Sequence, residues 1–166
     1  MKLPPAIKEV NKVNIVLVGP NTSGRTTLAN YMAQEHQRCV IRVDQLLDYW
    51  VKRGHSIAEE ATKFLEDRHA ELTAALAAQE AQKKAKKPKK GEVEIEINQA
   101  EYKILPKELL TRMVALRVQE EDCNAGSIFD CLTSENWPDE KFAISFISDA
   151  IPTQHVQVVM FNFNKE

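Results

Sequence analysis

Residues 13–27 read V-N-I-V-L-V-G-P-N-T-S-G-R-T-T, and this stretch decides the fold. Its first six residues form a short apolar run rich in β-branched side chains, which predicts a buried parallel strand. A glycine-containing turn follows at residues 19–27, and the next residues have the spacing of a helix that ends near His36. A second apolar run covers residues 39–43. Strand, loop, helix and strand form one βαβ unit, from which parallel sheets are built.

The segment after the second strand has a helical composition over residues 44–82. Gly54 is expected to separate a short helix from a longer one. Ser56 with Glu59 three residues later matches a capping box, which predicts that the longer helix begins there.

The last third of the chain returns to alternating helices and strands. Pro106 suits the first turn of a helix, because the ring fixes a helical φ and needs no amide donor. Apolar runs at residues 127–131 and 155–163 predict a third and a fourth strand, with a helix that begins near Pro138 between them.

Length and composition predict one soluble, intracellular domain that spans residues 1–166. The net charge is −2, which excludes a generally basic nucleic-acid-binding or membrane-surface protein. No apolar run approaches the roughly 20 residues that cross a bilayer, and residues 1–12 contain no signal-peptide core.

The cysteines are too few and too irregularly spaced to predict a disulfide framework. The three residues are Cys39, Cys123 and Cys131, and their odd number favours a reducing compartment with free thiols. Of Cys123 and Cys131, which flank a strand, at least one is expected to be a buried, inert thiol. The four histidines are scattered and form no metal-ligand spacing with the cysteines.

A lysine-rich insert interrupts the helical segment, which as a subdomain covers residues 44–104. Residues 83–90 read K-K-A-K-K-P-K-K, with six lysines in eight positions. A solvated linker is one interpretation, and a contact for an acidic partner such as tubulin or nucleic acid is the other. The alternating E-V-E-I-E-I at residues 92–97 fits either an exposed strand or an acidic counterpart to the lysines.

The turn after the first strand matches the phosphate-binding pattern G-x-x-x-x-G-K-[ST] at Gly19, Gly24, Arg25 and Thr26. Glycines allow successive N–H groups to point inward, and the following helix directs its positive end to the same place. The predicted strand before the turn and the predicted helix after it are the required context. The nucleotide-binding residues expected from the pattern are Gly19, Asn21, Thr22, Ser23, Gly24, Arg25, Thr26 and Thr27.

The pattern departs from its usual form at one decisive position, because Arg25 stands where lysine is expected. The lysine ammonium is compact and follows the β and γ phosphates through the reaction, whereas a guanidinium is longer, planar and forked. Phosphate binding is therefore expected to be weakened and phosphoryl transfer impaired. The alternative is that Arg25 faces solvent or an internal carboxylate and leaves the loop without phosphate.

A magnesium site is expected between this loop and the third strand. Thr26 occupies the hydroxyl position that would contact Mg²⁺. Asp130 ends the apolar run S-I-F-D, and carboxyl ends of parallel strands are where ligands bind. Mg–ATP is thus the cofactor that the loop could take. A helix cap or a turn is the alternative role for Asp130.

Together these residues resemble the adenylate kinase family. The run L-P-K-E-L-L-T-R-M-V-A-L-R-V-Q-E-E-D-C-N-A-G-S-I-F-D at residues 105–130 is similar to the family's Pro-opened helix, Asp-Cys turn, glycine and strand ending in Asp. The resemblance covers about residues 13–53 and 104–163. It implies a phosphate-loop, nucleoside-monophosphate-kinase-like three-layer α/β sandwich with a parallel sheet of order 2-3-1-4. The positions that carry the match are Pro106, Arg117, Asp122, Cys123, Gly126 and Asp130.

The departures from the family are concentrated in the groups that bind phosphate. The family follows the strand Asp with Gly-Phe-Pro-Arg, whose arginine holds the monophosphate, but here Cys131-Leu132-Thr133-Ser134 follows. The segment after the second strand, from Val43 to Asp48, also supplies no arginine. The arginine-bearing lid and a fifth strand are missing as well, which predicts a truncated domain.

The resemblance extends to the degenerate adenylate kinase-like module of a very large scaffold protein in the central pair of motile cilia. It implies a non-catalytic module in the cytoplasm and ciliary axoneme, with other axonemal proteins or tubulin as partners and no membrane. Two alternatives stay open: a sensor that binds ATP or GTP without transfer, and an active nucleoside monophosphate kinase.

Overall fold

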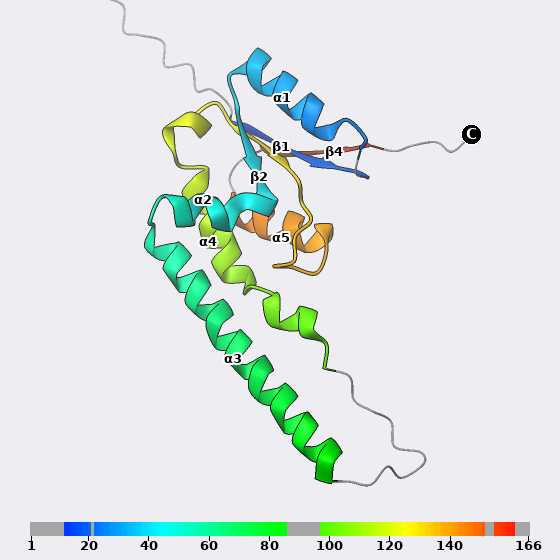
Figure 1. Ribbon diagram of the computed structural model, residues 1–166. Helices are drawn as coiled ribbons and strands as arrows, with labels where there is room; N and C mark the ends of the chain where they lie inside the picture. Colours follow the sequence, from blue (N-terminus) through cyan, green and yellow to red (C-terminus); the bar gives the residue numbers. More distant parts are fainter. Residues whose placement is uncertain (1–11, 21, 86–96, 152–154, 162–166) are drawn as a thin grey trace, which may run out of the picture.

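The computed structural model describes residues 12–20, 22–85, 97–151 and 155–161 of the chain (Figure 1). It is an α/β fold in which helices and strands alternate. The elements in chain order are β1 (Val13–Val18), α1 (Arg25–His36), β2 (Cys39–Arg42), the short 3-10 helix η1 (Val43–Gln45), α2 (Leu46–Lys52), α3 (Ser56–Ala85), η2 (Gln99–Lys103), α4 (Lys107–Arg117), η3 (Glu121–Cys123), β3 (Ser127–Asp130), α5 (Glu140–Ala150) and β4 (His155–Met160).

The sheet has four parallel strands in the order β2-β3-β1-β4, the order that the family resemblance implies. Ile15 pairs with Ile128 in the centre, and β4 pairs with β1 along all six of its residues. Gly126 lets β3 begin beside β1, because a Cβ at this position would lie 2.3 Å from the carbonyl oxygen of Val13. The family-like glycine therefore has a packing role.

Apolar side chains on the two faces of the sheet form two cores. On one face Ile15, Leu17 and Ile128 pack with Ala29 of α1. On the other face Val16 and Phe129 pack with residues of α2, α4 and α5. Because successive residues of a strand point to opposite faces, a continuous apolar run such as V-N-I-V-L-V supplies both cores. The result is a sheet covered by helices on both sides (Figure 1).

The helical segment between β2 and β3 contains the long helix α3, which extends away from the sheet (Figure 1). Its first two turns are anchored by buried Ile57 and Ala61, and most of residues 71–81 are exposed. The expected capping box at Ser56 is wrong. The preceding residue, His55, caps the helix, since its Nδ1 accepts the Ile57 N–H at 3.2 Å. The imidazole also packs on Trp50, which fixes its orientation.

The prediction of free thiols is wrong for two of the three cysteines, because Cys39 and Cys123 form a disulfide. They are 84 residues apart in sequence, but their Cα atoms are 5.3 Å apart. Cys39 opens β2, and Cys123 lies just before β3, so the pairing of these neighbouring strands brings the two together. Only Cys131 is free, and it is partly buried.

Several predicted features lie outside the described residues. They are Asn21 of the phosphate loop, residues 86–90 of the lysine-rich insert, residues 92–96 of the alternating acidic segment, and the end of the fourth strand beyond residue 161. Among the described residues, no helix is both long and apolar enough to cross a membrane.

Candidate functional site

The predicted phosphate loop lies where β1 ends and α1 begins, at the carboxyl ends of the strands. Gly19 has φ 153°, and a Cβ there would lie 2.7 Å from Cβ of Phe161, so the loop packs closely against the end of β4. Thr22 and Gly24 both have left-handed conformations, with φ of 68° and 82°. Gly24 is the N-cap of α1, whose first residue is Arg25. The backbone thus turns sharply into a helix N-terminus, the geometry that favours anions.

Arg25 makes an ion pair with a carboxylate of the same chain. The residue is 7 % exposed, and its Nη1 lies 3.4 Å from Oε1 of Glu140, the first residue of α5. Of the two alternatives for an Arg25 that does not bind phosphate, solvent or an internal carboxylate, the structure shows the internal carboxylate. Glu140 offsets the positive charge that the loop would otherwise offer to phosphate. No sequence signal singles out Glu140, since it lies 115 residues from Arg25.

Thr26 and Asp130 come together as the predicted magnesium site requires. The Thr26 hydroxyl donates a 2.7 Å hydrogen bond to Oδ2 of Asp130, which is fully buried at the end of β3. Oδ1 of Asp130 is also buried and has no hydrogen-bond partner among the described residues. A buried carboxylate oxygen without a donor is costly, and Mg²⁺ is a ligand that would satisfy it. The structure therefore brings together two oxygen atoms that a magnesium site would use.

Two further side-chain oxygens at the carboxyl ends of the strands are buried without a hydrogen-bond donor among the described residues. They are Ser23 Oγ and Asp44 Oδ1. The amide of Asp44 donates to the carbonyl of Cys131 at 3.0 Å, which ties the segment after β2 to the segment after β3. Thr27 is exposed on the first turn of α1. Serine, threonine and aspartate oxygens thus gather at this edge of the sheet.

Cys131 stands directly after Asp130, where the resembling family has glycine. Its φ is 57°, a left-handed conformation that is uncommon for a residue with a side chain. Burial raises the pKa of its thiol, and the negative charges of Asp130 and Asp44 raise it further. Both effects favour the neutral thiol, which is the less reactive form.

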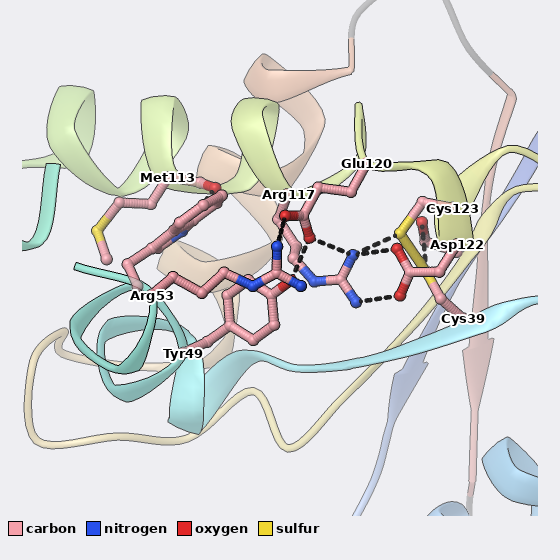
Figure 2. Close-up of polar contacts among 10 residues, drawn as sticks. Cys39, Tyr49, Arg53, Met113, Arg117, Glu120, Asp122 and Cys123 are labelled. Carbon is pink, nitrogen blue, oxygen red and sulfur yellow. Dashed lines mark hydrogen bonds and ion pairs between the residues drawn. A yellow bond between two sulfur atoms is a disulfide. The ribbon is translucent and has the colours of Figure 1, made fainter. Parts of the chain in front are cut away.

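A second polar cluster surrounds Arg117 at the end of α4 (Figure 2). Its two guanidinium nitrogens donate to both carboxylate oxygens of Asp122 at 2.8 Å and 2.7 Å. The same guanidinium lies 4.6 Å from the ring centre of Tyr49 and 3.1 Å from a carboxylate oxygen of Glu120. Burial lowers the pKa of Arg117, but the hydrogen bonds and charge of Asp122 outweigh it and raise the pKa above its ordinary value. Arg117 also holds the pKa of Asp122 below its ordinary value.

A cavity of about 290 Å³ lies between β2 and α2, with Arg117 in its wall. Its other charged residues are Arg42, Asp48 and Lys52. A second cavity of about 380 Å³ lies between α2 and α3 and has His55 in its wall. Residues 19–27 line neither of these cavities. Where adenylate kinases carry a monophosphate-binding arginine soon after β2, helix α2 carries Asp48 and ends at Lys52.

The site thus contains a magnesium-type oxygen pair next to a loop whose cation is paired internally. Sequence reasoning predicted that Thr26 and Asp130 lie together. It missed Glu140 and the Asp44 oxygen that has no partner in the described part of the chain. No protein-family model matches the chain, and the search of curated proteins finds no significant match.

Proposed function

We propose that this chain is a non-catalytic, adenylate kinase-like module of a large scaffold protein in the central pair of the ciliary axoneme, where it is needed for cilium motility. The module of hydin, the hydrocephalus-inducing protein, is the one it resembles. The observation that carries the non-catalytic part is the Arg25–Glu140 ion pair, because it offsets the only cation within residues 19–27.

The chemistry of phosphoryl transfer supports this conclusion. Two bound nucleotides bring several negative charges together, and kinases stabilise the reaction with lysine, arginine and Mg²⁺. Here Arg25 contacts Glu140, and neither Asp48 nor the Cys131-Leu132-Thr133-Ser134 segment can replace the missing arginines. Phosphate transfer would therefore lack most of its electrostatic stabilisation.

The catalytic part of the proposal is tested with a transfer assay. Purified protein is incubated with Mg–ATP and AMP, and ADP is measured over hours. We expect no ADP above the background of a sample without protein. Turnover that disappears in an Asp130→Ala variant would contradict the proposal and favour an active kinase.

The scaffold part is tested in motile ciliated cells. The tagged full-length protein is followed after detergent has removed the ciliary membrane and soluble matrix. We expect the protein to remain with the axoneme and deletion of residues 13–161 to impair beating. Complete release with the soluble fraction, together with normal beating after the deletion, would contradict this role.

A nucleotide-binding sensor is the second candidate, and one observation favours it. Thr26 contacts Asp130 at 2.7 Å, and a buried oxygen of Asp130 is left without a donor among the described residues. A module that no longer binds nucleotide does not require an Asp130 oxygen free for a metal ion, whereas a module that binds magnesium–nucleotide does. ATP should then raise the melting temperature with Mg²⁺ present and not with EDTA, and Asp130→Asn should abolish this shift.

A further inference from the structure

We propose that Cys39 and Cys123 are a reversible redox site that exchanges with glutathione disulfide. The pair joins the first residue of β2 to the last residue of η3, near the amino-terminal ends of the strands. This location is separate from the phosphate loop, which lies at the carboxyl ends. The proposal is independent of whether nucleotide binds.

The backbone positions allow the bond to open and close without a change of fold. The two Cα atoms are 5.3 Å apart, within the usual range for a disulfide. Cys39 is held there by the pairing of β2 with β3, where it is opposite Ser127, and Cys123 ends the short helix η3 just before that strand. Ser127 Oγ lies 3.3 Å from the sulfur of Cys39 and can accept the hydrogen of a reduced thiol.

Arg117 gives Cys123 the environment of a stabilised thiolate. Its Nη1 lies 2.9 Å from Sγ of Cys123, and Arg117 is only 6 % exposed (Figure 2). A neighbouring guanidinium lowers the pKa of a thiol and makes it reactive at neutral pH. A carboxylate oxygen of Asp122 lies within 4.8 Å of both sulfurs and opposes this effect, but Asp122 is itself paired with Arg117 through two hydrogen bonds.

The two residues differ in exposure, and we assign the first step to the more exposed one. Cys39 is 9 % exposed on the edge strand β2, and Cys123 is 1 % exposed. The Cys39 thiolate attacks glutathione disulfide, forms a mixed disulfide and releases one glutathione. The Cys123 thiolate then attacks the Cys39 sulfur and releases the second. Both thiols lose a proton, the protein gives up two electrons, and the glutathione disulfide becomes two glutathione molecules.

The redox state changes the wall of the cavity beside α2. In the reduced state Arg117 faces the Cys123 thiolate as well as Asp122, and in the oxidised state the sulfur carries no charge. Arg117 lines that cavity together with Tyr49 and Lys52. Oxidation therefore links η3 covalently to β2. It also removes the negative charge of the thiolate, so that the Arg117 guanidinium interacts more strongly with Asp122, Glu120 and any group in the cavity.

The test is a titration of purified protein in glutathione buffers of increasing oxidised fraction, followed by acid quench, denaturation, thiol alkylation and intact mass. We expect three alkylated thiols in reducing buffer and one in oxidising buffer, with one transition between them. Peptide mapping should place the remaining thiol at Cys131, since it is the free cysteine of the structure. A bond that survives millimolar glutathione, or a pair that never oxidises, would overturn the proposal.

Variants separate the two steps. Cys123→Ser should trap one glutathione on Cys39, whereas Cys39→Ser should bind far less, because Cys123 is buried. Cys131→Ser is the matched control and should leave the transition unchanged. Equal glutathione on both single variants would contradict the assigned order of steps.

Arg117 is a positioning residue here, and its role is read from a pH profile. The closing rate is the rate at which Cys123 displaces glutathione from the mixed disulfide on Cys39. In Arg117→Lys this rate should fall about tenfold at pH 7. The difference from wild type should shrink above pH 9, where thiols ionise without a neighbouring cation. The pH profile of the wild-type protein is a second test, since its closing rate should already be near its maximum at pH 7. If the rate at which Cys123 displaces glutathione in the wild type rises tenfold per pH unit up to pH 8.5, the thiolate role is overturned. A tightly retained zinc ion in the reduced protein would overturn it as well.

Discussion

Gly126 shows how one residue can be essential for the sheet. Its φ is 104°, and an added Cβ would lie 2.3 Å from the Val13 carbonyl oxygen. Gly126→Ala should lower the free energy of unfolding by about 3 kcal/mol, because strain and overlap with the backbone of β1 act together. Gly54→Ala is the matched control, since φ is 61° there but nothing lies within 4 Å. Gly54→Ala should lower the free energy of unfolding by about 1 kcal/mol. Equal losses in urea denaturation would contradict this explanation.

Cys131 is a second residue with a glycine-like conformation, at φ 57°. Cys131→Gly should raise the free energy of unfolding by about 0.5 kcal/mol, because relief of the left-handed strain outweighs the greater freedom of glycine when unfolded. Cys131→Val should lower it by about 1 kcal/mol, since a β-branched side chain tolerates this conformation poorly. The two variants are compared by urea denaturation under reducing conditions. A more stable valine variant would exclude backbone strain as the cause.

The Arg25–Glu140 ion pair is tested with a double-mutant cycle. Arg25→Met, Glu140→Gln and the double variant are compared by urea denaturation. The coupling free energy should be about 0.5–1 kcal/mol, because Arg25 is buried, Glu140 is 29 % exposed on its side chain, and the two atoms are 3.4 Å apart. Lys141→Gln, which removes the adjacent charge, should show no coupling to Arg25→Met. Additive effects of the first two substitutions would mean that Glu140 does not hold Arg25.

At the scale of elements, sequence patterns predicted every strand, because each one combines an apolar run with a turn residue. Residues 13–18 match β1 without adjustment, and the fourth strand begins at His155 as expected. Helix starts were less predictable. Pro106 is the N-cap of α4 and not part of its first turn, and α5 begins at Glu140, after Asp139, whose carboxylate accepts the Phe142 N–H. Local sequence defines such boundaries only loosely.

Helix α3 begins at Ser56 as predicted, and it provides a direct test of the misassigned capping residue. Its N-terminal amide of Ile57 is bound by His55 and not by Ser56. His55→Ala should lower the free energy of unfolding by about 1 kcal/mol, since it removes the capping acceptor. Ser56→Ala should change it by less than about 0.5 kcal/mol. Urea denaturation of the two variants decides between them, and a larger loss for Ser56→Ala would restore the capping box.

At the scale of the whole molecule, the features that could not be predicted from the sequence are contacts between distant segments. The strand order followed from the resemblance to adenylate kinases. The Thr26–Asp130 contact could be predicted because parallel strands bring their carboxyl ends to one edge. The Arg25–Glu140 pair and the Cys39–Cys123 bond span 115 and 84 residues, and no local pattern marks their partners. Both arise only after the sheet has assembled.

These long-range contacts also define the proposed role. The Thr26–Asp130 oxygen pair beside the loop has the arrangement expected of a magnesium–nucleotide site, but an internal carboxylate pairs with the loop arginine. The most direct test is a calorimetric titration of the protein with Mg–ATP, with Mg–GTP and AMP as controls. We expect no binding heat and no thermal shift at millimolar nucleotide. Micromolar binding of Mg–ATP that is lost in Asp130→Ala would contradict a non-binding module and favour the nucleotide sensor.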